Sequence, residues 1–439
     1  MPCAPIVRLA SLSLLLATTC LWGCGYSRSP AKGPAAAAAA TPDPLWPVNH
    51  TDLAAVRIER KATLSDRASA RDSSTLVVEA TPVGQGWISW RQDASERKAG
   101  DPVRFRYCAW RTPPVVGETI ADPLERLLAL EASASFRMGF RLWMPETGEP
   151  KGLVIHQWGL QGERYERRIT EALRRSGWAV LAYDGLLWRP GGAFAVTGAS
   201  DDALSGDNGK RPSRRDTEAE IDARRTAVAA AASLAAREFD DMIGQYVLGQ
   251  EAALIHVRQR FPALAERPLA VIGCSLGSLM TPALVTRLGD EVRACVLVGS
   301  GANMLRITGE SWQDSYYSRV RRGTGDALSL PSAERDHLLT TYLERTTLDP
   351  YVTAAALRRI PTLMLHASWD SIVPAASGDL LWEQAGRPER WSGAFGHIWM
   401  FLTLDGVADD LVAWLDRAVA APTAPAAPAG STISATPRD

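Results

Sequence analysis

Two kinds of hydrophobic pattern divide the chain near Pro150. Before it, residues 103–107 and 136–142 alternate apolar positions with charged or small ones. Such alternation is typical of strands with one buried face. After it, short and wholly apolar runs alternate with longer stretches of helical spacing. Strands buried on both faces and separated by helices predict a parallel sheet wrapped by helices, which places the chain in the α/β class.

This interpretation gives an order of elements from residue 150 onward. The predicted strands lie at residues 153–156, 178–183, 269–274, 294–298, 362–366 and 388–391. The predicted helices lie at residues 163–176, 217–260 and 276–288. A last helix should pack on one face of the sheet, because helical spacing separates Leu404, Val407, Leu411, Trp414 and Leu415.

The first residues have the pattern of an export signal. Arg8 is the only charge before an apolar run that is too short to span a membrane. Residues 21–24, Leu-Trp-Gly-Cys, resemble the lipobox of bacterial lipoproteins, in which the Cys becomes lipidated and N-terminal. We therefore predict a signal peptide at residues 1–23 and a lipid on Cys24. The protein would be exported and held at the cell envelope, facing the periplasm or the cell surface. The alternative is a plain secretory signal in which Cys24 is incidental.

Composition sets the boundaries of the folded part. Residues 24–49 are rich in Ala and Pro and predict a disordered tether, and residues 421–439 predict a disordered tail. Between them, residues 50–133 predict a β-rich N-terminal extension. Residues 134–420 predict the α/β domain itself.

Two insertions in this domain are predicted to shape a substrate pocket. Residues 189–216 lack apolar periodicity, and a loop of this length in a compact domain is usually functional or disordered. Residues 305–348 carry Trp312, Tyr316 and Tyr317 beside several arginines. The second insertion is either a lid that brings aromatic surface to the ligand or a solvated helical connection.

Composition also narrows the function classes. The chain has 439 residues, 46% apolar and 22% charged, which excludes a disordered chain, a fibre, a coiled coil and a multi-span membrane protein. Lys and Arg total 48 against 49 Asp and Glu, so no basic field is available to hold a nucleic acid. Six Cys are too few for a disulfide framework. No zinc, redox-cysteine or phosphate-loop motif occurs, so we predict no metal and no cofactor.

The candidate chemistry begins at residues 273–277, which are Gly-Cys-Ser-Leu-Gly. An apolar strand runs into this segment and a helical stretch follows it. On a sharp turn between strand and helix, a Ser hydroxyl is exposed above the sheet edge at a helix N-terminus, which favours developing negative charge. Ser275 is therefore the candidate nucleophile. The alternative is a glycine-rich turn in which Ser275 has a structural role.

A serine nucleophile needs a base and a group that orients the base. His397 lies late in the chain, on a Gly-flanked loop after the last predicted strand. Asp370 follows the apolar strand at 362–366, on the loop at its carboxyl end. The order Ser, acid, His is the one this architecture uses. Asp184, which precedes Ser275, is the weaker candidate for the acid, and the alternative role of Asp370 is that of an ordinary turn residue.

With these residues in place, the chain resembles the α/β-hydrolase superfamily over residues 136–419. The resemblance rests on Gly-Cys-Ser-Leu-Gly, on Ser-Trp-Asp-Ser-Ile-Val-Pro around Asp370, and on the late Gly-His that contains His397. It implies an α/β-hydrolase fold with a mostly parallel central sheet flanked by helices. It also implies Ser275 as nucleophile, Asp370 as acid and His397 as base.

The same resemblance implies an oxyanion hole. One donor is the backbone N–H of Leu276, directly after the nucleophile. The second comes from the loop after the strand at 153–156, where the superfamily usually has His-Gly and this chain has His-Gln. We expect the N–H of Trp158 to be this donor, with Gly159 next. His156 would orient the loop rather than react.

The sequence thus predicts a serine hydrolase that cleaves a carboxylic ester through an acyl-enzyme intermediate. The alternatives are a peptidase, an amidase or an acyltransferase on the same three side chains, or a non-catalytic binding lipoprotein of the cell envelope that keeps the fold. The expected partners are a small-molecule or acyl substrate and a membrane contacted only through the N-terminal lipid anchor. No nucleic-acid partner is expected, and the oligomeric state is left open.

Overall fold

A computed structural model of the chain describes residues 26–31, 60–62, 74–80, 86–93, 100–109, 136–159, 163–188, 218–310 and 332–421. For residues 60–62, 74–80, 86–93, 163–166, 184–188 and 218–224 it describes the backbone alone. The predicted signal peptide, Cys24, the insertion at 189–216, the aromatic part of the second insertion and the predicted tail from residue 422 lie outside the described residues.

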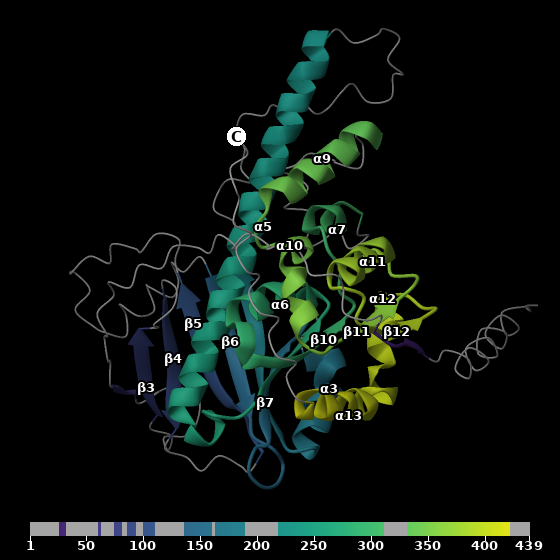
Figure 1. Cartoon of the computed structure of the whole chain (residues 1–439). Coiled ribbons are helices and arrows are strands. Elements are labelled where there is room, and N and C mark those ends of the chain that lie inside the picture. Colours follow the sequence, from purple (N-terminus) through teal and green to yellow (C-terminus); the bar gives the residue numbers. More distant parts are fainter. Residues whose placement is uncertain are drawn as a thin grey trace, which may run out of the picture.

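Twelve strands of the described chain form one sheet, in the order β1-β12-β11-β10-β9-β7-β8-β6-β5-β4-β3-β2 (Figure 1). They are β1 (Ser27–Ser29), β2 (Arg60–Ala62), β3 (Ser74–Ala80), β4 (Gly86–Asp93), β5 (Val103–Ala109), β6 (Phe136–Trp143), β7 (Gly152–Gln157), β8 (Trp178–Trp188), β9 (Leu269–Cys274), β10 (Val292–Val298), β11 (Thr362–Ala367) and β12 (Glu389–Gly393).

Two groups of helices pack against this sheet. In the first, α6 lies on β9 and β10 and contacts the long α5, while in the second α3 and α13 lie on each other and on β8 and β10 (Figure 1). The helices are α3 (Glu163–Arg175), α5 (Glu218–Arg260), α6 (Leu276–Leu288), α7 (Met304–Glu310), α9 (Ser332–Arg345), α10 (Pro350–Thr353), α11 (Ala375–Gln384), α12 (His397–Leu402) and α13 (Ala408–Ala420), with short 3₁₀ turns η1 (Pro262–Leu264), η2 (Gly289–Glu291), η3 (Ala354–Arg359) and η4 (Leu404–Gly406).

None of the helices in the described ranges has the length and apolarity that crossing a membrane requires.

The central strands of the sheet are parallel. β8, β7, β9, β10, β11 and β12 are parallel neighbours in that order. Every residue of β7, β9 and β11 is buried, as their wholly apolar runs predicted. The predicted α/β architecture, with a parallel central sheet flanked by helices, is confirmed. The carboxyl ends of these parallel strands meet at one edge of the sheet, where the candidate site lies.

The β-rich extension predicted at residues 50–133 continues the same sheet. β2 to β5 pair antiparallel with one another, and β5 pairs antiparallel with β6. Phe105 of β5 lies opposite Phe140 of β6, and their rings stack with centroids 5.2 Å apart. The last strand of the extension therefore shares the hydrophobic core of the parallel part.

The prediction of a disordered tether is wrong at its beginning. Residues Ser27–Ser29 form β1, which pairs antiparallel with β12 at the end of the sheet. The Tyr26 ring packs edge-on against Phe395 at 5.1 Å, and the Arg28 guanidinium lies 4.4 Å from the centre of the Trp391 ring. Composition did not predict this strand because its residues are polar. An edge strand such as β12, however, offers unpaired N–H and C=O groups to any extended segment.

The described parts of the second insertion are α7 and α9. α9 packs along α5, where the Phe239 and Tyr342 rings meet at 5.9 Å. Asp240 of α5 accepts a hydrogen bond from the backbone N–H of Thr347 at 2.8 Å, just after α9 ends. These contacts describe the two helical ends of the insertion, and residues 311–331, which carry the aromatic side chains of the lid prediction, lie outside the described ranges.

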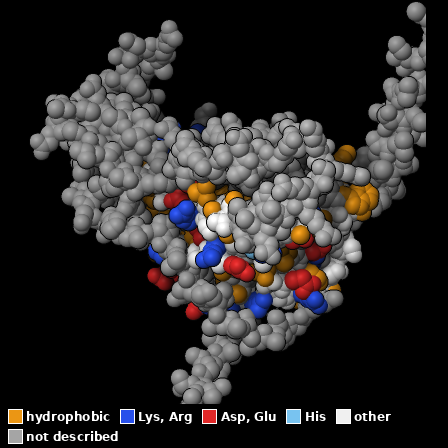
Figure 2. Space-filling view, turned by 90° about the horizontal axis from the view of Figure 1, so that it is seen from above, with side chains coloured by type: hydrophobic (Ala, Val, Ile, Leu, Met, Phe, Trp, Pro, Cys, Tyr) orange, Lys and Arg blue, Asp and Glu red, His pale blue; other side chains and the backbone are white. Residues whose placement is uncertain are grey.

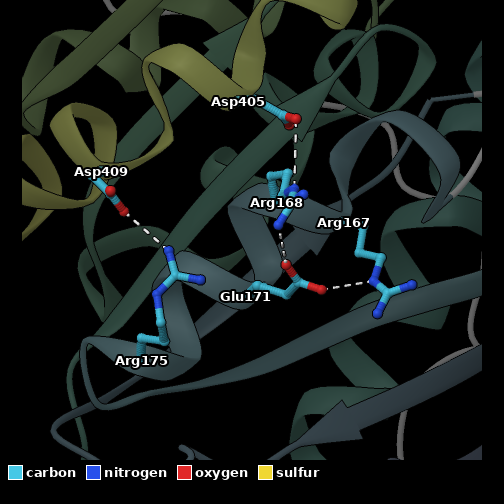
Figure 3. Close-up of polar contacts among 6 residues, drawn as sticks. All are labelled: Arg167, Arg168, Glu171, Arg175, Asp405 and Asp409. Atoms are coloured by element: carbon cyan, nitrogen blue, oxygen red, sulfur yellow. Dashed lines mark hydrogen bonds and ion pairs between the residues drawn. The ribbon is translucent and has the colours of Figure 1, made fainter.

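Ion pairs hold the C-terminal segment against α3. Arg168 pairs with Asp405 of η4 at 3.5 Å, and Arg175 pairs with Asp409 of α13 at 3.2 Å (Figure 3). Glu171 accepts a hydrogen bond from Arg168 at 3.3 Å in the same cluster. Exposed pairs of this kind stabilise a fold by at most about 1 kcal/mol each. Their effect here is to keep the chain that follows α12 on one face of the molecule.

Candidate active site

Ser275 lies on the turn between β9 and α6. Its backbone has φ 48° and ψ −120°, a conformation that L-residues rarely adopt. The N–H of Ser275 donates to the carbonyl of Val298 at 2.8 Å, and the N–H of Ser278 donates to the carbonyl of Ser275 at 2.9 Å. Hydrogen bonds on both sides therefore hold the strained turn, which places Ser275 at the carboxyl edge of the sheet.

Close contacts require the two Gly residues of the turn. A Cβ at Gly277 would lie 2.2 Å from the carbonyl oxygen of Gln157, and a Cβ at Gly273 would lie 2.1 Å from the hydroxyl oxygen of Thr281. Either contact is far below van der Waals separation, so a side chain there would move the turn. The turn therefore packs directly on the backbone that ends β7.

His397 lies between Ser275 and Asp370. Its Nε2 is 2.9 Å from the hydroxyl oxygen of Ser275, and its Nδ1 is 2.6 Å from Oδ2 of Asp370. A neutral imidazole that donates from Nδ1 to the carboxylate presents an unprotonated Nε2 to the hydroxyl. His397 and Asp370 are only 5% and 8% exposed, so water has little access to the bond between them.

Backbone donors hold the carboxylate of Asp370. Its Oδ1 accepts hydrogen bonds from the N–H groups of Ile372 and Val373, both at 2.9 Å. Oδ2 is thereby left for the imidazole. Sequence reasoning missed these two positions because a backbone donor has no signature in residue type.

Two further backbone hydrogen bonds tie the loop of the acid to the loop of the base. The N–H of Ser368 donates to the carbonyl of Gly393 at 2.9 Å, and the N–H of Trp369 donates to the carbonyl of Phe395 at 3.1 Å. β11 and β12 are parallel neighbours, so their carboxyl ends lie side by side. The sheet itself therefore sets the distance between the acid and the base.

Gly299, directly after β10, lies against the ring of His397. It has φ 62°, and a Cβ there would lie 3.0 Å from Cε1 of His397 and 2.6 Å from the terminal methyl of Met400. Both the conformation and the lack of space exclude a side chain at this position. Sequence reasoning missed this role, because no pattern around Gly299 distinguishes it from other Gly residues that follow strands.

The two expected oxyanion donors lie in segments next to the nucleophile turn. Leu276 is the first residue of α6, so its N–H has no acceptor inside the helix. Trp158 follows β7, whose last residue, Gln157, contacts Gly277 of the turn. The Trp158 ring is 2% exposed, and its carbonyl accepts a hydrogen bond from the hydroxyl of Tyr183. The loop that carries Trp158 is thus held in place beside the turn.

His156 contacts the same turn from within β7, and it is fully buried. Its Nδ1 accepts a hydrogen bond from the indole N–H of Trp158 at 3.2 Å. An indole N–H only donates, so Nδ1 is unprotonated and Nε2, 3.7 Å from the sulfur of Cys274, carries the proton. Burial lowers the pKa of His156 to about 3, which keeps the ring neutral. His156 therefore links Trp158 to the residue that precedes Ser275.

Two other histidines are buried away from this chain of bonds. Burial lowers the pKa of His256 in α5 and of His366 in β11 to about 4 in each case. His366 lies 3.9 Å from Asp379 rather than against the acid of the site. Over the described ranges, no three or more His, Cys, Asp or Glu side chains gather as a metal site would require.

No family model matches the chain, and no curated protein matches it. Among solved structures, an esterase of Pyrococcus furiosus matches at 15% identity, over 65% of this chain and 88% of that chain, with a TM-score of 0.37. Acetyl xylan esterase 1 from Thermoanaerobacterium sp. JW/SL YS485 matches at 14% identity, over 72% and 87%, with a TM-score of 0.40. The acylaminoacyl peptidase of Pyrococcus horikoshii matches at 13% identity, over 79% and 48%, with a TM-score of 0.40.

Proposed function

We propose that this chain is a serine hydrolase that cleaves carboxylic esters. The observation that carries the proposal is the unbroken line of hydrogen bonds from the Ser275 hydroxyl through His397 to Asp370. A hydroxyl becomes a useful nucleophile when a base accepts its proton and a third group orients that base. The strained turn at Ser275 adds support, because such strain persists only where the surrounding structure enforces it.

The reaction proceeds in two halves. His397 takes the proton of Ser275 as the hydroxyl oxygen attacks the ester carbonyl, and then gives that proton to the leaving alcohol. The acyl group stays on Ser275. His397 next takes a proton from water, whose oxygen attacks the acyl carbonyl, and returns it to Ser275 as the acid leaves. Asp370 remains ionised throughout and stabilises the imidazolium, while Ile372 and Val373 hold its other oxygen.

The backbone N–H groups of Leu276 and Trp158 donate to the negative oxygen that forms in each half. The N-terminus of α6 adds a favourable partial charge at Leu276. His156 fixes the Trp158 ring, and with it the loop that carries the second donor. Loss of one such donor typically raises the barrier by roughly 3 kcal/mol.

Esters are the proposed substrates because an alcohol leaves a tetrahedral intermediate more easily than an amine does. The test is the initial rate on p-nitrophenyl esters from acetyl to palmitoyl, beside aminoacyl p-nitroanilides. We expect ester hydrolysis that Ser275→Ala abolishes and that Ser233→Ala, on α5, leaves intact. Faster cleavage of the anilides would make the chain an amidase, and product formed only with an added alcohol would make it an acyltransferase. Absence of turnover by the folded protein would support the binding lipoprotein.

We also propose that the chain is exported and carries a lipid on Cys24. The support is the segment at residues 21–24 with the short apolar run before it. Growth with radiolabelled palmitate should label the wild type and not Cys24→Ser. Equal labelling of the two would contradict the lipid site.

A further inference from the structure

The described surface has one group of large, exposed apolar side chains. Trp369 is 70% exposed, Trp399 58%, Leu402 51% and Ile398 38%. No other large hydrophobic side chain within the described ranges is classed with them as exposed. We call these four side chains the apolar rim, because they border the loops of the acid and the base.

Three members of the apolar rim share one helix, and the fourth lies on the loop beside the start of that helix. Ile398, Trp399 and Leu402 lie on α12 at spacings of three and four residues, which places them on neighbouring turns of one face. The backbone of Trp369 lies beside the start of α12, because a Cβ at Gly396, just before the helix, would lie 3.4 Å from the Trp369 carbonyl oxygen. In the view from above, hydrophobic side chains gather at the right-hand edge of the described surface, on the side where Figure 1 places α12 (Figure 2).

The N-terminal part of the described chain begins beside this rim. Tyr26 packs on Phe395, two residues before α12. Burial raises the pKa of Tyr26 to about 12, and the side chain of Thr403 beside its hydroxyl opposes that rise. Thr403 directly follows Leu402. Tyr26 therefore lies against the end of α12.

This position limits how far Cys24 can lie from the rim. Two residues of fully extended chain span at most roughly 7 Å, so the Cα atoms of Cys24 and Tyr26 are no farther apart than that. A lipid on Cys24 would enter a membrane close to Trp399 and Leu402. A disordered tether would have let the body turn freely, and the pairing of β1 with β12 removes that freedom.

We propose that the apolar rim docks on the lipid surface into which the Cys24 anchor inserts. The folded body then touches the membrane directly, in addition to the lipid anchor. This differs from the expectation, based on the sequence, that only the anchor contacts the membrane. Indole rings suit this place, since Trp is favoured at the boundary between headgroups and acyl chains. The rim itself need bind only weakly, because the anchor holds it at a high effective concentration near the membrane.

The carboxylates that follow α12 in the sequence are paired, so they permit this approach. Asp405 and Asp409 each pair with an arginine of α3 (Figure 3). Asp410 pairs with Arg28 of β1. Pairing offsets the repulsion that an isolated carboxylate would meet at an anionic lipid surface. The docking goes beyond the proposed hydrolysis and does not depend on it, but it rests on the proposed lipid on Cys24.

Photocrosslinking measures which face touches lipid. A benzophenone amino acid is placed at position 399 or at position 261 of the full-length chain, which is reconstituted in vesicles of an equimolar mixture of phosphatidylethanolamine and phosphatidylglycerol. Phe261 is the matched control, because it is a partly exposed aromatic before β9, at the amino edge of the parallel strands. We expect at least about tenfold more lipid adduct from position 399, the ratio that about 1.4 kcal/mol of preference gives.

Variants of the rim sharpen the test. With the photoreactive group at position 369, the pair Trp399→Gln and Leu402→Gln should lower the lipid adduct, whereas Trp399→Phe and Leu402→Met should keep it. Ser275→Ala should leave the yield of lipid adduct unchanged at position 399 and at position 261. This result would separate the docking proposal from the proposed hydrolysis. Equal lipid adduct from positions 399 and 261 would overturn the docking. Adducts from position 399 to the same chain or to a second copy, in place of lipid, would overturn it as well.

Discussion

Two histidines contact the turn that carries Ser275, one from each neighbouring segment. His156 in β7 has its Nε2 3.7 Å from the sulfur of Cys274, and His397 at the start of α12 has its Nε2 2.9 Å from the hydroxyl of Ser275. The two rings differ in the partner of Nδ1. At His156 the partners are the indole N–H of Trp158 at 3.2 Å and the hydroxyl of Thr170 at 3.1 Å, and at His397 the partner is the carboxylate of Asp370.

The partner of Nδ1 decides whether an imidazole can act as a base at Nε2. The indole N–H donates to Nδ1 of His156, so Nδ1 must carry a lone pair. The single proton of the neutral ring therefore lies on Nε2, and Nε2 cannot accept a proton from another group. A carboxylate at Nδ1 draws the proton to that side and leaves Nε2 of His397 free to accept one. Under the proposed function, the two regions use the same side chain for opposite purposes: His156 fixes a loop and His397 moves a proton.

The most sensitive test of this difference between the two histidines is to substitute each of them in turn. His397→Gln should lower kcat on an ester by on the order of 10⁶, because the hydroxyl then has no base. His156→Gln should lower it by only about tenfold, through a shift of the Trp158 loop. Rates of the two variants on one p-nitrophenyl ester make the measurement, with His337→Gln of α9 as a control for the substitution. A larger loss at position 156 than at position 397 would reverse the assignment.

The next largest effect should come from the carboxylate that distinguishes the two rings. Asp370→Asn should lower kcat by about 10⁴, because an amide can hold His397 in the wrong tautomer and cannot stabilise an imidazolium. Asp184→Asn, at the weaker candidate for the acid, should leave kcat near that of the wild type. Steady-state kinetics on one ester separate the two, and the opposite order would make Asp184 the acid.

A smaller loss should follow from crowding the His397 ring without altering its chemistry. Gly299→Ala should lower kcat by about 10²-fold, because the added methyl must displace the ring from Ser275. Gly289→Ala is the matched control, since Gly289 also has a positive φ, 56°, but its Cβ would meet nothing within 4 Å. Both variants carry backbone strain, so equal kcat values for the two would show that the ring had not been displaced.

The smallest predicted effect is the contribution of His156 to the pH dependence of the unfolding free energy. Burial lowers its pKa to about 3 in the folded state from about 6.5 in the unfolded state, so the unfolded chain takes up a proton first as pH falls. The stability it contributes is therefore complete above about pH 6.5 and is lost towards pH 3, at up to about 1.4 kcal/mol per pH unit. His156→Gln should flatten the fall in unfolding free energy between these limits, measured by urea denaturation. Above pH 7 the two curves should run parallel, and equal slopes below it would contradict the account.

The strands and the strand–turn–helix at Ser275 could be predicted because burial leaves a direct mark on sequence. Strands covered on both faces must be apolar throughout, as at 153–156 and 269–274, and a carboxyl-edge loop must follow each one. The same logic placed Asp370 and His397 on adjacent loops. The structure brings His397 within hydrogen-bonding distance of both Ser275 and Asp370.

Other structural features have no recognisable pattern in the amino-acid sequence. β1 forms from polar residues, because backbone pairing at a sheet edge needs no particular side chain. The donors at Ile372 and Val373 are backbone groups, and the contact of Gly299 with His397 depends on positions 98 residues apart. Whether an aromatic residue is buried or exposed in a late loop also depends on packing, which is why the apolar rim was not predicted.

The most direct test of the central claim is labelling with a fluorophosphonate, followed by peptide mass spectrometry. The account predicts one phosphonyl group per folded chain, located on Ser275, with labelling slowed by orders of magnitude in His397→Gln and little changed in His156→Gln. Absence of label on well-folded protein at neutral pH would contradict it, as would a label on any residue other than Ser275.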